Sequence, residues 1–360
     1  MPSLFDPCRV GDLQLANRIV MAPLTRSRSV GLKPGPLAVE YYRQRASAGL
    51  IISEGAQVCP EGQGYLDTPG IHSQEQVEAW RKVTQAVHAE GGKIAVQLWH
   101  VGRISHADFQ PGGGAPLSST ARPIQAKTFT ARGLEPVTPA RALRTEEIPA
   151  VVAQFAHAAH CAMEAGFDAV EVHGANGYLI DQFLRDGSNL RDDDYGGPVE
   201  NRIRLLREVT EALIAVWGKD RVGVRLSPNG ETQGVDDSAP EKLFPAAAAA
   251  LDALGIAFLE LREPGPDGTF GRTDVPKQSP AIREAFKGPL ILNSDYDVAK
   301  AEAALAGGAA DAIAFGRPFI GNPDLVERIR TGAEWAADNP QTWYSPGPEG
   351  YTDYPALVTA

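Results

Sequence analysis

Three side chains that can hold an oxygen or deliver a proton lie close together after an apolar run. His173, Asn176 and Tyr178 follow the segment "DAVEV" at 168–172. Imidazole and amide groups can hold an oxygen by hydrogen bonds, and a phenol can donate a proton to a developing carbanion. Taken alone, the three also fit a core histidine, an asparagine in a turn and a packing tyrosine. The elements around them must decide between these interpretations.

Eight short apolar runs alternate with helical patterns along the chain. Their nearly continuous apolar character is typical of strands covered on both faces. Helices are expected at 145–166, 201–218 and 245–255, with Thr145 as an N-cap and Pro245 as a first helical residue. This alternation predicts an α/β fold, a single (β/α)8 TIM barrel over residues 1–360. The predicted strands lie within 18–25, 50–57, 93–100, 168–173, 221–227, 256–263, 289–294 and 311–318.

Three segments fall outside this alternation. Residues 8–20 suggest a small β-hairpin that plugs the barrel floor. Residues 107–143, after the third strand, are rich in glycine and proline and long for a connection, which is typical of a lid over an active site. The tail at 335–360, rich in tryptophan, tyrosine and proline, is expected to pack back on the barrel.

Composition narrows the partners and the compartment. The chain has 34 basic and 45 acidic residues, a net charge of −11, which disfavours nucleic acid and anionic membranes as partners. Cys8, Cys59 and Cys161 show neither metal-binding nor disulfide spacing. No signal peptide and no stretch of about 18 apolar residues is evident. We therefore expect a soluble, cytoplasmic protein.

In a TIM barrel the active site lies at the carboxyl ends of the strands. No lysine ends a strand here, which argues against a Schiff-base aldolase. No His-x-His motif or acidic cluster is present at these ends, so no metal is expected. The ends are mostly neutral and hydrogen-bonding, with a few arginines: Thr25, Glu54, Gly55, Gln97, Trp99, His173, Arg225, Arg262, Asn293, Gly316 and Arg317.

The last two strand ends predict an anion site. Backbone N–H groups near Gly316, with the Arg317 guanidinium, could cradle a phosphate, and Ser294 and Asp295 after the seventh strand could supply the other half. A phosphate site beside hydrogen-bonding side chains and Trp99 indicates a flat, phosphorylated cofactor. FMN fits better than pyridoxal phosphate, which would need a lysine.

A resemblance to a known family rests on motifs that recur in order between residues 20 and 355. They are "APLTRSRS", "EGAQV", "QLWHVGR", "HGANGYLIDQFL", "YGGPVENR", "AFGRPFIGNPDLVERI" and "GYTDYP". The chain resembles the Old Yellow Enzyme family of flavin-dependent ene-reductases. It is similar to the branch of the N-ethylmaleimide, glycerol trinitrate and pentaerythritol tetranitrate reductases. Thr25 stands where the thermophilic-like branch has a cysteine, and no iron–sulfur cysteine cluster is present.

The resemblance implies separate roles for the opening residues. His173 and Asn176 would hold the carbonyl or nitro oxygen of the substrate, and Tyr178 would protonate its α-carbon. The residues that it implies as FMN contacts are Pro23, Leu24, Thr25, Gly55, Gln97, Arg225, Ser294, Asp295, Gly316 and Arg317. Tyr65, Trp99 and Tyr344 would form the substrate pocket. Taken singly, each could instead be a turn residue, a surface amide, a buried ion pair or a core aromatic.

The implied function is an FMN-dependent NAD(P)H:acceptor oxidoreductase, an NADPH dehydrogenase or ene-reductase. NADPH or NADH would reduce a tightly but non-covalently bound FMN. Enones, enals, maleimides or nitroalkenes would then accept a hydride from flavin N5 and a proton from Tyr178, with nitrate esters as a further candidate class. A monomer or weak homodimer is expected. Two alternatives are a hydroxy-acid oxidase with a histidine base near N5, and a flavin-binding sensor with little turnover.

Overall fold

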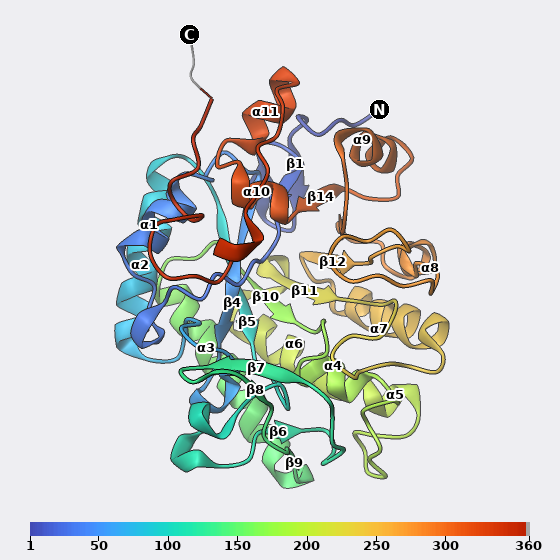
Figure 1. The fold of residues 1–360 in the computed structure, drawn as a ribbon. Helices are drawn as coiled ribbons and strands as arrows, with labels where there is room; N and C mark the ends of the chain where they lie inside the picture. Colours follow the sequence, from blue (N-terminus) through green and yellow to red (C-terminus); the bar gives the residue numbers. More distant parts are fainter. Residues whose placement is uncertain (358–360) are drawn as a thin grey trace.

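The computed structural model, which describes residues 1–357, contains a closed parallel barrel surrounded by helices (Figure 1). The strands pair in the order β3–β4–β5–β10–β11–β12–β13–β14, and β14 closes on β3. Each predicted strand segment contains one barrel strand, so the (β/α)8 prediction is confirmed. The barrel strands are β3 (Ile19–Met21), β4 (Leu50–Gln57), β5 (Ile94–Trp99), β10 (Ala169–His173), β11 (Val222–Leu226), β12 (Phe258–Arg262), β13 (Leu290–Asn293) and β14 (Ala312–Phe315).

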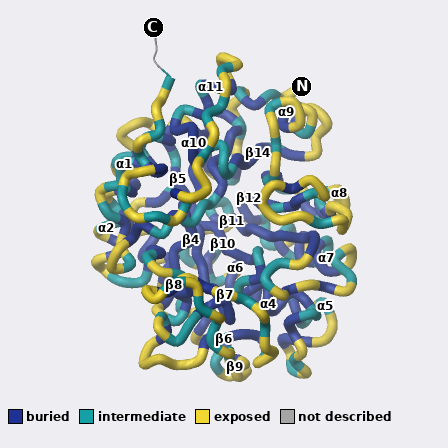
Figure 2. The backbone as a smooth tube through the Cα atoms, viewed as in Figure 1, coloured by how far each residue is buried: buried dark blue, intermediate teal, exposed yellow. Residues whose placement is uncertain are grey.

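The strand register brings the polar strand ends to one level. His173 pairs with Arg225, Arg225 with Glu260, and Arg262 with Asn293 across three neighbouring strand pairs. The strands themselves are almost entirely buried, and Figure 2 shows them as a dark core inside helices whose outer faces are exposed. Because residues two apart on a strand face the same side, each inward residue near a strand end is presented at the barrel mouth.

Helices cover the outside of the barrel. The α6 helix ends at Gly218, whose φ of 74° is the left-handed conformation that glycine permits at a helix end. Within residues 1–357, no helix is both long and apolar enough for a membrane crossing. The helices are α1 (Pro36–Arg43), α2 (Gln74–Ala89), α3 (Ile148–Glu164), α4 (Leu179–Leu184), α5 (Val199–Arg202), α6 (Arg204–Trp217), α7 (Pro240–Leu254), α8 (Ser279–Ala285), α9 (Val298–Ala306), α10 (Arg317–Gly321) and α11 (Leu325–Thr331).

Two predicted helix starts are wrong. Thr145 does not cap α3, because a 3-10 turn at Thr145–Glu147 comes first and the threonine hydroxyl bonds Asp193 instead. The α7 helix begins at Pro240, and Pro245 lies inside it. Pro240 takes the first-turn position in which a missing N–H costs nothing, and the upstream turn extends the helix beyond its alanine-rich part.

The predicted floor hairpin is present. Strands β1 (Cys8–Val10) and β2 (Leu13–Leu15) pair antiparallel. Val10, Leu13 and Leu15 pack in one apolar cluster with inward residues of the barrel, among them Val20 and Phe258. The hairpin therefore closes the end of the barrel opposite the polar strand ends.

The segment after β5 forms an excursion that reaches the mouth. It contains β6 (Leu117–Ser118), β7 (Lys127–Thr130), β8 (Gly133–Pro136) and β9 (Arg141–Ala142), with β7 and β8 paired as the hairpin in green in Figure 1. Ile124 and Ala126 pack against the buried cluster of Trp99, Val101 and Ile104, as Tyr65 and Tyr178 do. The excursion therefore packs on the same cluster, around Trp99, as two tyrosines near the mouth.

The described part of the tail packs back on the barrel, as predicted. Arg28 donates hydrogen bonds to the carbonyl oxygens of Thr342 and Glu349, at 2.8 and 2.9 Å. The Tyr351 ring is buried and stacks on the Tyr41 ring, with 4.2 Å between centroids. Positions 358–360, which the prediction included, lie outside the described residues.

Candidate active site

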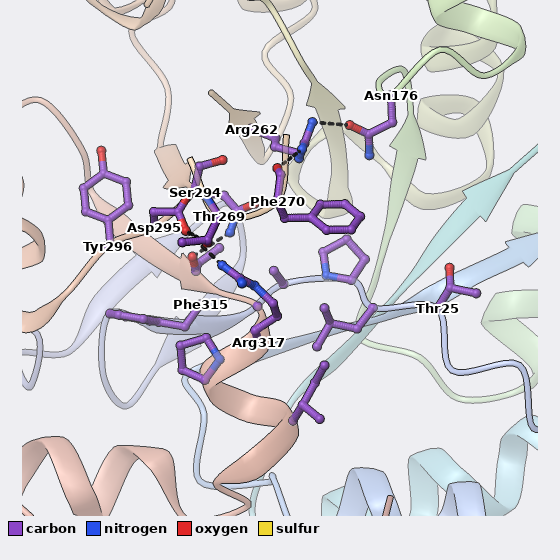
Figure 3. Close-up of a pocket in the computed structure, with 18 of the residues that line it drawn as sticks. Thr25, Asn176, Arg262, Thr269, Phe270, Ser294, Asp295, Tyr296, Phe315 and Arg317 are labelled. Carbon is purple, nitrogen blue, oxygen red and sulfur yellow. Dashed lines mark hydrogen bonds and ion pairs between the residues drawn. The ribbon is translucent and has the colours of Figure 1, made fainter. Parts of the chain in front are cut away.

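A cavity of ≈ 530 Å³ lies at the carboxyl ends of the strands. The structure brings most of the predicted site residues together on its wall. They are Pro23, Leu24, Thr25, Gln97, Trp99, His173, Asn176, Tyr178, Arg225, Ser294, Asp295, Gly316, Arg317 and Tyr344. Figure 3 shows how several of them converge from different strand ends.

Gly55 and Tyr65 were predicted for the site but do not line the cavity. A Cβ atom at Gly55 would lie 2.6 Å from Cε3 of Trp99, so this glycine lets the indole pack against β4. The Tyr65 ring stacks on Trp99, with 5.7 Å between centroids, and its hydroxyl lies 3.0 Å from that of Tyr178. Both residues therefore support the wall from behind.

The backbone turns sharply between His173 and Tyr178. Asn176 has a φ of 59° and Gly177 a φ of 79°, both left-handed. A Cβ atom at Gly177 would lie 2.5 Å from the carbonyl oxygen of Thr232, so only glycine fits there. Tyr178 then caps α4, and its ring meets the His173 ring edge to face with 5.0 Å between centroids. The turn thus places all three side chains on one side of the mouth.

Burial keeps these groups neutral. Burial, with the positive charges of Arg225 and Arg262, lowers the pKa of His173 well below its usual value. The Ala175 N–H donates to Nδ1 of His173 at 3.3 Å, which assigns the ring proton of the neutral imidazole to Nε2. Burial also raises the pKa of Tyr178, so its phenol keeps its proton. The site therefore offers two N–H or O–H donors without a charge of their own.

Beneath the cavity lies a buried polar layer. Nε2 of Gln97 donates to Oε1 of Glu171 at 2.8 Å, which leaves the Gln97 carbonyl oxygen available to the cavity. Arg225 donates through Nη2 to Oδ1 of Asn293 at 2.9 Å, and its Nε lies 3.2 Å from Oε1 of Glu260. Burial and the neighbouring Glu260 raise the pKa of Glu171 well above its usual value. These contacts fix the orientation of the Gln97 amide and of the Arg225 guanidinium.

Sequence reasoning missed Glu171 and Glu260, although a signal exists. Each lies two residues before a strand end that faces the cavity, His173 and Arg262 respectively. Side chains on a strand face alternate sides, so both carboxyl groups had to point inward. A single charged residue at an inward position of an apolar strand therefore predicts a buried polar group beneath a barrel site.

The opposite side of the cavity carries full charges. Nη2 of Arg317 lies 2.9 Å from Oδ1 of Asp295, which also bonds the Thr269 hydroxyl (Figure 3). Ser294 and Asp295 have left-handed φ angles of 110° and 52°. The Asp295 carboxylate is thus the partner of Arg317, and it is the backbone N–H groups of this turn that could serve an anion.

The residues present fit FMN. Thr25 offers a hydroxyl, Gln97 a carbonyl oxygen and Arg225 a cation along one wall, the pattern that the carbonyl, imide and N1 edge of a flavin requires. Nε1 of Trp99 is buried and has no hydrogen-bond partner within residues 1–357. Arg317 lies on the other wall, where a phosphate would need a cation. Fold and site together define a flavin-dependent oxidoreductase barrel.

Comparisons with known proteins agree. Residues 3–335 match the NADH:flavin oxidoreductase / NADH oxidase family. A solved old yellow enzyme homologue from Zymomonas mobilis is 54% identical with a TM-score of 0.97, and the match covers 99% of this chain and 100% of that one. Morphinone reductase in complex with tetrahydroNAD is 46% identical with a TM-score of 0.94, over 99% and 98% of the chains. The 12-oxophytodienoate reductase 2 of Arabidopsis thaliana is 44% identical, over 98% of this chain and 96% of its own. The chain belongs to this flavin oxidoreductase family and is of the Old Yellow Enzyme type.

Proposed function

We propose that the protein is an FMN-dependent NAD(P)H:acceptor oxidoreductase that reduces activated carbon–carbon double bonds. The observation that carries this proposal is the set of neutral donors at the buried His173 and the half-buried Asn176 and Tyr178, beside a wall that fits a flavin. The names of two relatives, morphinone reductase and 12-oxophytodienoate reductase, support a reductive reaction.

FMN, when bound, supplies the hydride after accepting one from NADPH or NADH. The protein holds the acceptor. The His173 Nε2–H and the Asn176 Nδ2–H bind the carbonyl or nitro oxygen, on which negative charge develops as the double bond is reduced. Donors fixed in a buried site favour that developing charge over the neutral ground state. The aromatic rings of Trp99 and Tyr344 line the same cavity and suit a flat, conjugated substrate.

Tyr178 delivers the proton to the α-carbon. Its raised pKa keeps the phenol protonated until a strong base, the enolate-like carbon, forms beside it. The Tyr65 hydroxyl lies 3.0 Å from that of Tyr178 and 3.4 Å from Oε1 of Gln233. Its single hydrogen can turn from the Gln233 oxygen to the Tyr178 phenolate and stabilise it once the proton has left. We therefore propose that Tyr65 acts on the proton donor.

The substrate range is part of the proposal. We infer that the protein takes enones, enals, maleimides and nitroalkenes, and that nitrate esters use the same oxygen-binding donors. We also propose that the FMN is held tightly but non-covalently and that NADPH or NADH is the reductant. The protein is proposed to be cytoplasmic and a monomer or weak homodimer. The free cysteines Cys8, Cys59 and Cys161 support a reducing compartment.

One experiment separates the candidate functions. The purified protein is expected to be yellow, to bleach anaerobically with NADPH and to regain its colour with 2-cyclohexenone. Bleaching by a hydroxy acid instead of NADPH would indicate an oxidase, and bleaching without recolouring by any of the proposed acceptors would indicate a sensor. A colourless protein that binds no added FMN would contradict the whole proposal.

A further inference from the structure

The hydrogen-bonding groups of Asn176 are nearly all engaged by protein. Its backbone N–H donates to Oγ of Ser227 at 2.8 Å, and its backbone oxygen accepts from Nε2 of Gln233 at 2.9 Å. Its side-chain Oδ1 accepts from Nη1 of Arg262 at 3.3 Å. Nδ2 is the group left for a ligand, and Figure 3 shows it turned away from Arg262. Asparagine also tolerates the left-handed φ of 59° at this position.

Arg262 is itself anchored. Its Nη2 donates to the carbonyl oxygen of Phe270 at 2.6 Å, and its guanidinium lies 5.5 Å from the centre of the Phe270 ring. A Cβ atom at Gly271 would lie 2.8 Å from Nη2, so the loop approaches the guanidinium closely. Burial and the nearby Arg225 lower the pKa of Arg262 to about 10, which leaves it a cation at neutral pH. Sequence reasoning placed Arg262 at a strand end without giving it a role.

We propose that Arg262 is a positioning residue that sets which end of the Asn176 amide faces the substrate. An amide can rotate so that its oxygen and nitrogen exchange places, with little change in shape. A guanidinium has only hydrogen-bond donors, so it can bond the amide oxygen but not the NH2 group. Asn176 is thereby held as a donor, and the site selects ligands that present an electron-rich oxygen. This inference rests on the proposed function, since the ligand oxygen belongs to the acceptor.

The arrangement also links a loop to the oxygen-binding pair. Phe270 lies in the segment between β12 and α8, and its carbonyl fixes the second branch of the guanidinium whose first branch holds Asn176. A bidentate anchor of this kind defines the plane of the guanidinium, which a single contact would leave free to rotate. The orientation of the amide therefore depends on the conformation of that loop.

A double-mutant cycle on the FMN-loaded protein tests the inference, with 4-chlorophenol as the probe and the flavin absorbance change as the readout. A phenol oxygen needs the same donors as the substrate oxygen. Arg262→Met is expected to weaken phenol binding about 5- to 10-fold, the value of one hydrogen bond. In the Asn176→Ala background the same change is expected to have no effect, because no amide remains to orient.

Two further variants sharpen the test. Arg262→Lys keeps a donor for Oδ1 and should restore most of the phenol affinity. Lys277→Met removes a cation that does not line the cavity, and phenol binding should not change. Unaltered FMN content and thermal midpoint show that each variant is folded.

The outcomes are distinct. Equal loss in both backgrounds would mean that Arg262 contacts the ligand directly, and no loss in either would mean that it does not orient the amide; both overturn the inference. If the wild-type protein binds no FMN or no phenol, the proposed function fails before the cycle begins. If it binds both and the coupling is absent, only the role of Arg262 is refuted.

Discussion

The two sides of the cavity differ in charge and in exposure. At the end of β10, His173 and Tyr178 are held neutral by burial. At the ends of β13 and β14, Asp295 and Arg317 form a fully charged pair whose side chains are 27% and 29% exposed. One side offers neutral donors, and the other a cation that already has a partner.

The difference suits the two ligand groups that we propose for these sides. A phosphate is charged at all times, so a permanent cation suits it, and partial exposure limits the desolvation cost of that charge. A substrate oxygen gains charge only as the reaction proceeds. Buried neutral donors favour that charge when it appears and do not attract anions beforehand. Changing one residue on either side should therefore affect one function and leave the other intact.

The largest effect is expected on the neutral side. Tyr178→Phe removes the proton donor and should slow reduction of 2-cyclohexenone roughly 10²- to 10⁴-fold. Reduction of the flavin by NADPH transfers no proton from this residue and should stay near normal. Stopped-flow absorbance measures the two half-reactions separately. Slowed flavin reduction with normal enone reduction would contradict the division of labour between the two sides.

A smaller effect is expected on the pH dependence of stability, because a buried histidine stays neutral in the folded protein. Burial lowers the pKa of His100 to about 4, from about 6.5 in an unfolded chain. Between these pH values the unfolded chain binds a proton that the folded protein refuses, so acidification destabilises the fold. The loss should reach about 3 kcal/mol of unfolding free energy by pH 4.

Urea unfolding across this pH range tests that effect. His100→Gln keeps an acceptor for the Gly102 N–H, which donates to Nδ1 of His100 at 3.0 Å, and removes the titration. The gap in stability between wild type and variant should change by about 3 kcal/mol from pH 7 to pH 4. A constant gap would show that His100 titrates normally in the folded protein.

The charged side is expected to control cofactor retention. Arg317→Met removes the cation and leaves the Asp295 carboxylate facing the phosphate, so the FMN dissociation constant should rise roughly 10- to 100-fold. Recovery of flavin fluorescence on dilution measures it. Arg330→Met, which removes an exposed arginine from α11, is the matched control. At saturating FMN the Arg317→Met protein should still reduce enones. Loss of enone reduction under these conditions would contradict separate functions for the two sides.

Much of this comparison could be predicted from the sequence. Periodicity alone located the eight strands, because parallel strands buried on both faces leave unbroken apolar runs. The fold then placed His173 and Arg317 at one mouth, although they are far apart in the chain. Motif resemblance supplied the roles that the residue types left open.

The remainder depends on distances that a sequence does not encode. The contact between Arg262 and Asn176 joins two strand ends through side-chain rotamers, and its anchor at Phe270 lies on an irregular loop. The pairing of Asp295 with Arg317 likewise depends on the backbone turn at Ser294. Turn signals in sequence usually involve glycine or asparagine, and here a serine adopts the unusual conformation.

That serine gives the smallest predicted effect, which tests whether the charged side is strained. Ser294 has a φ of 110°, a left-handed conformation that costs a residue with a Cβ about 1–2 kcal/mol. Ser294→Gly removes this strain but raises the conformational entropy of the unfolded chain. The unfolding free energy of the FMN-free protein should therefore rise by only roughly 0.5–1 kcal/mol. Ser47→Gly, at an exposed turn outside the left-handed region, should instead lower it by a similar amount. Equal losses in the two variants would mean that the turn at Ser294 on the charged side is unstrained.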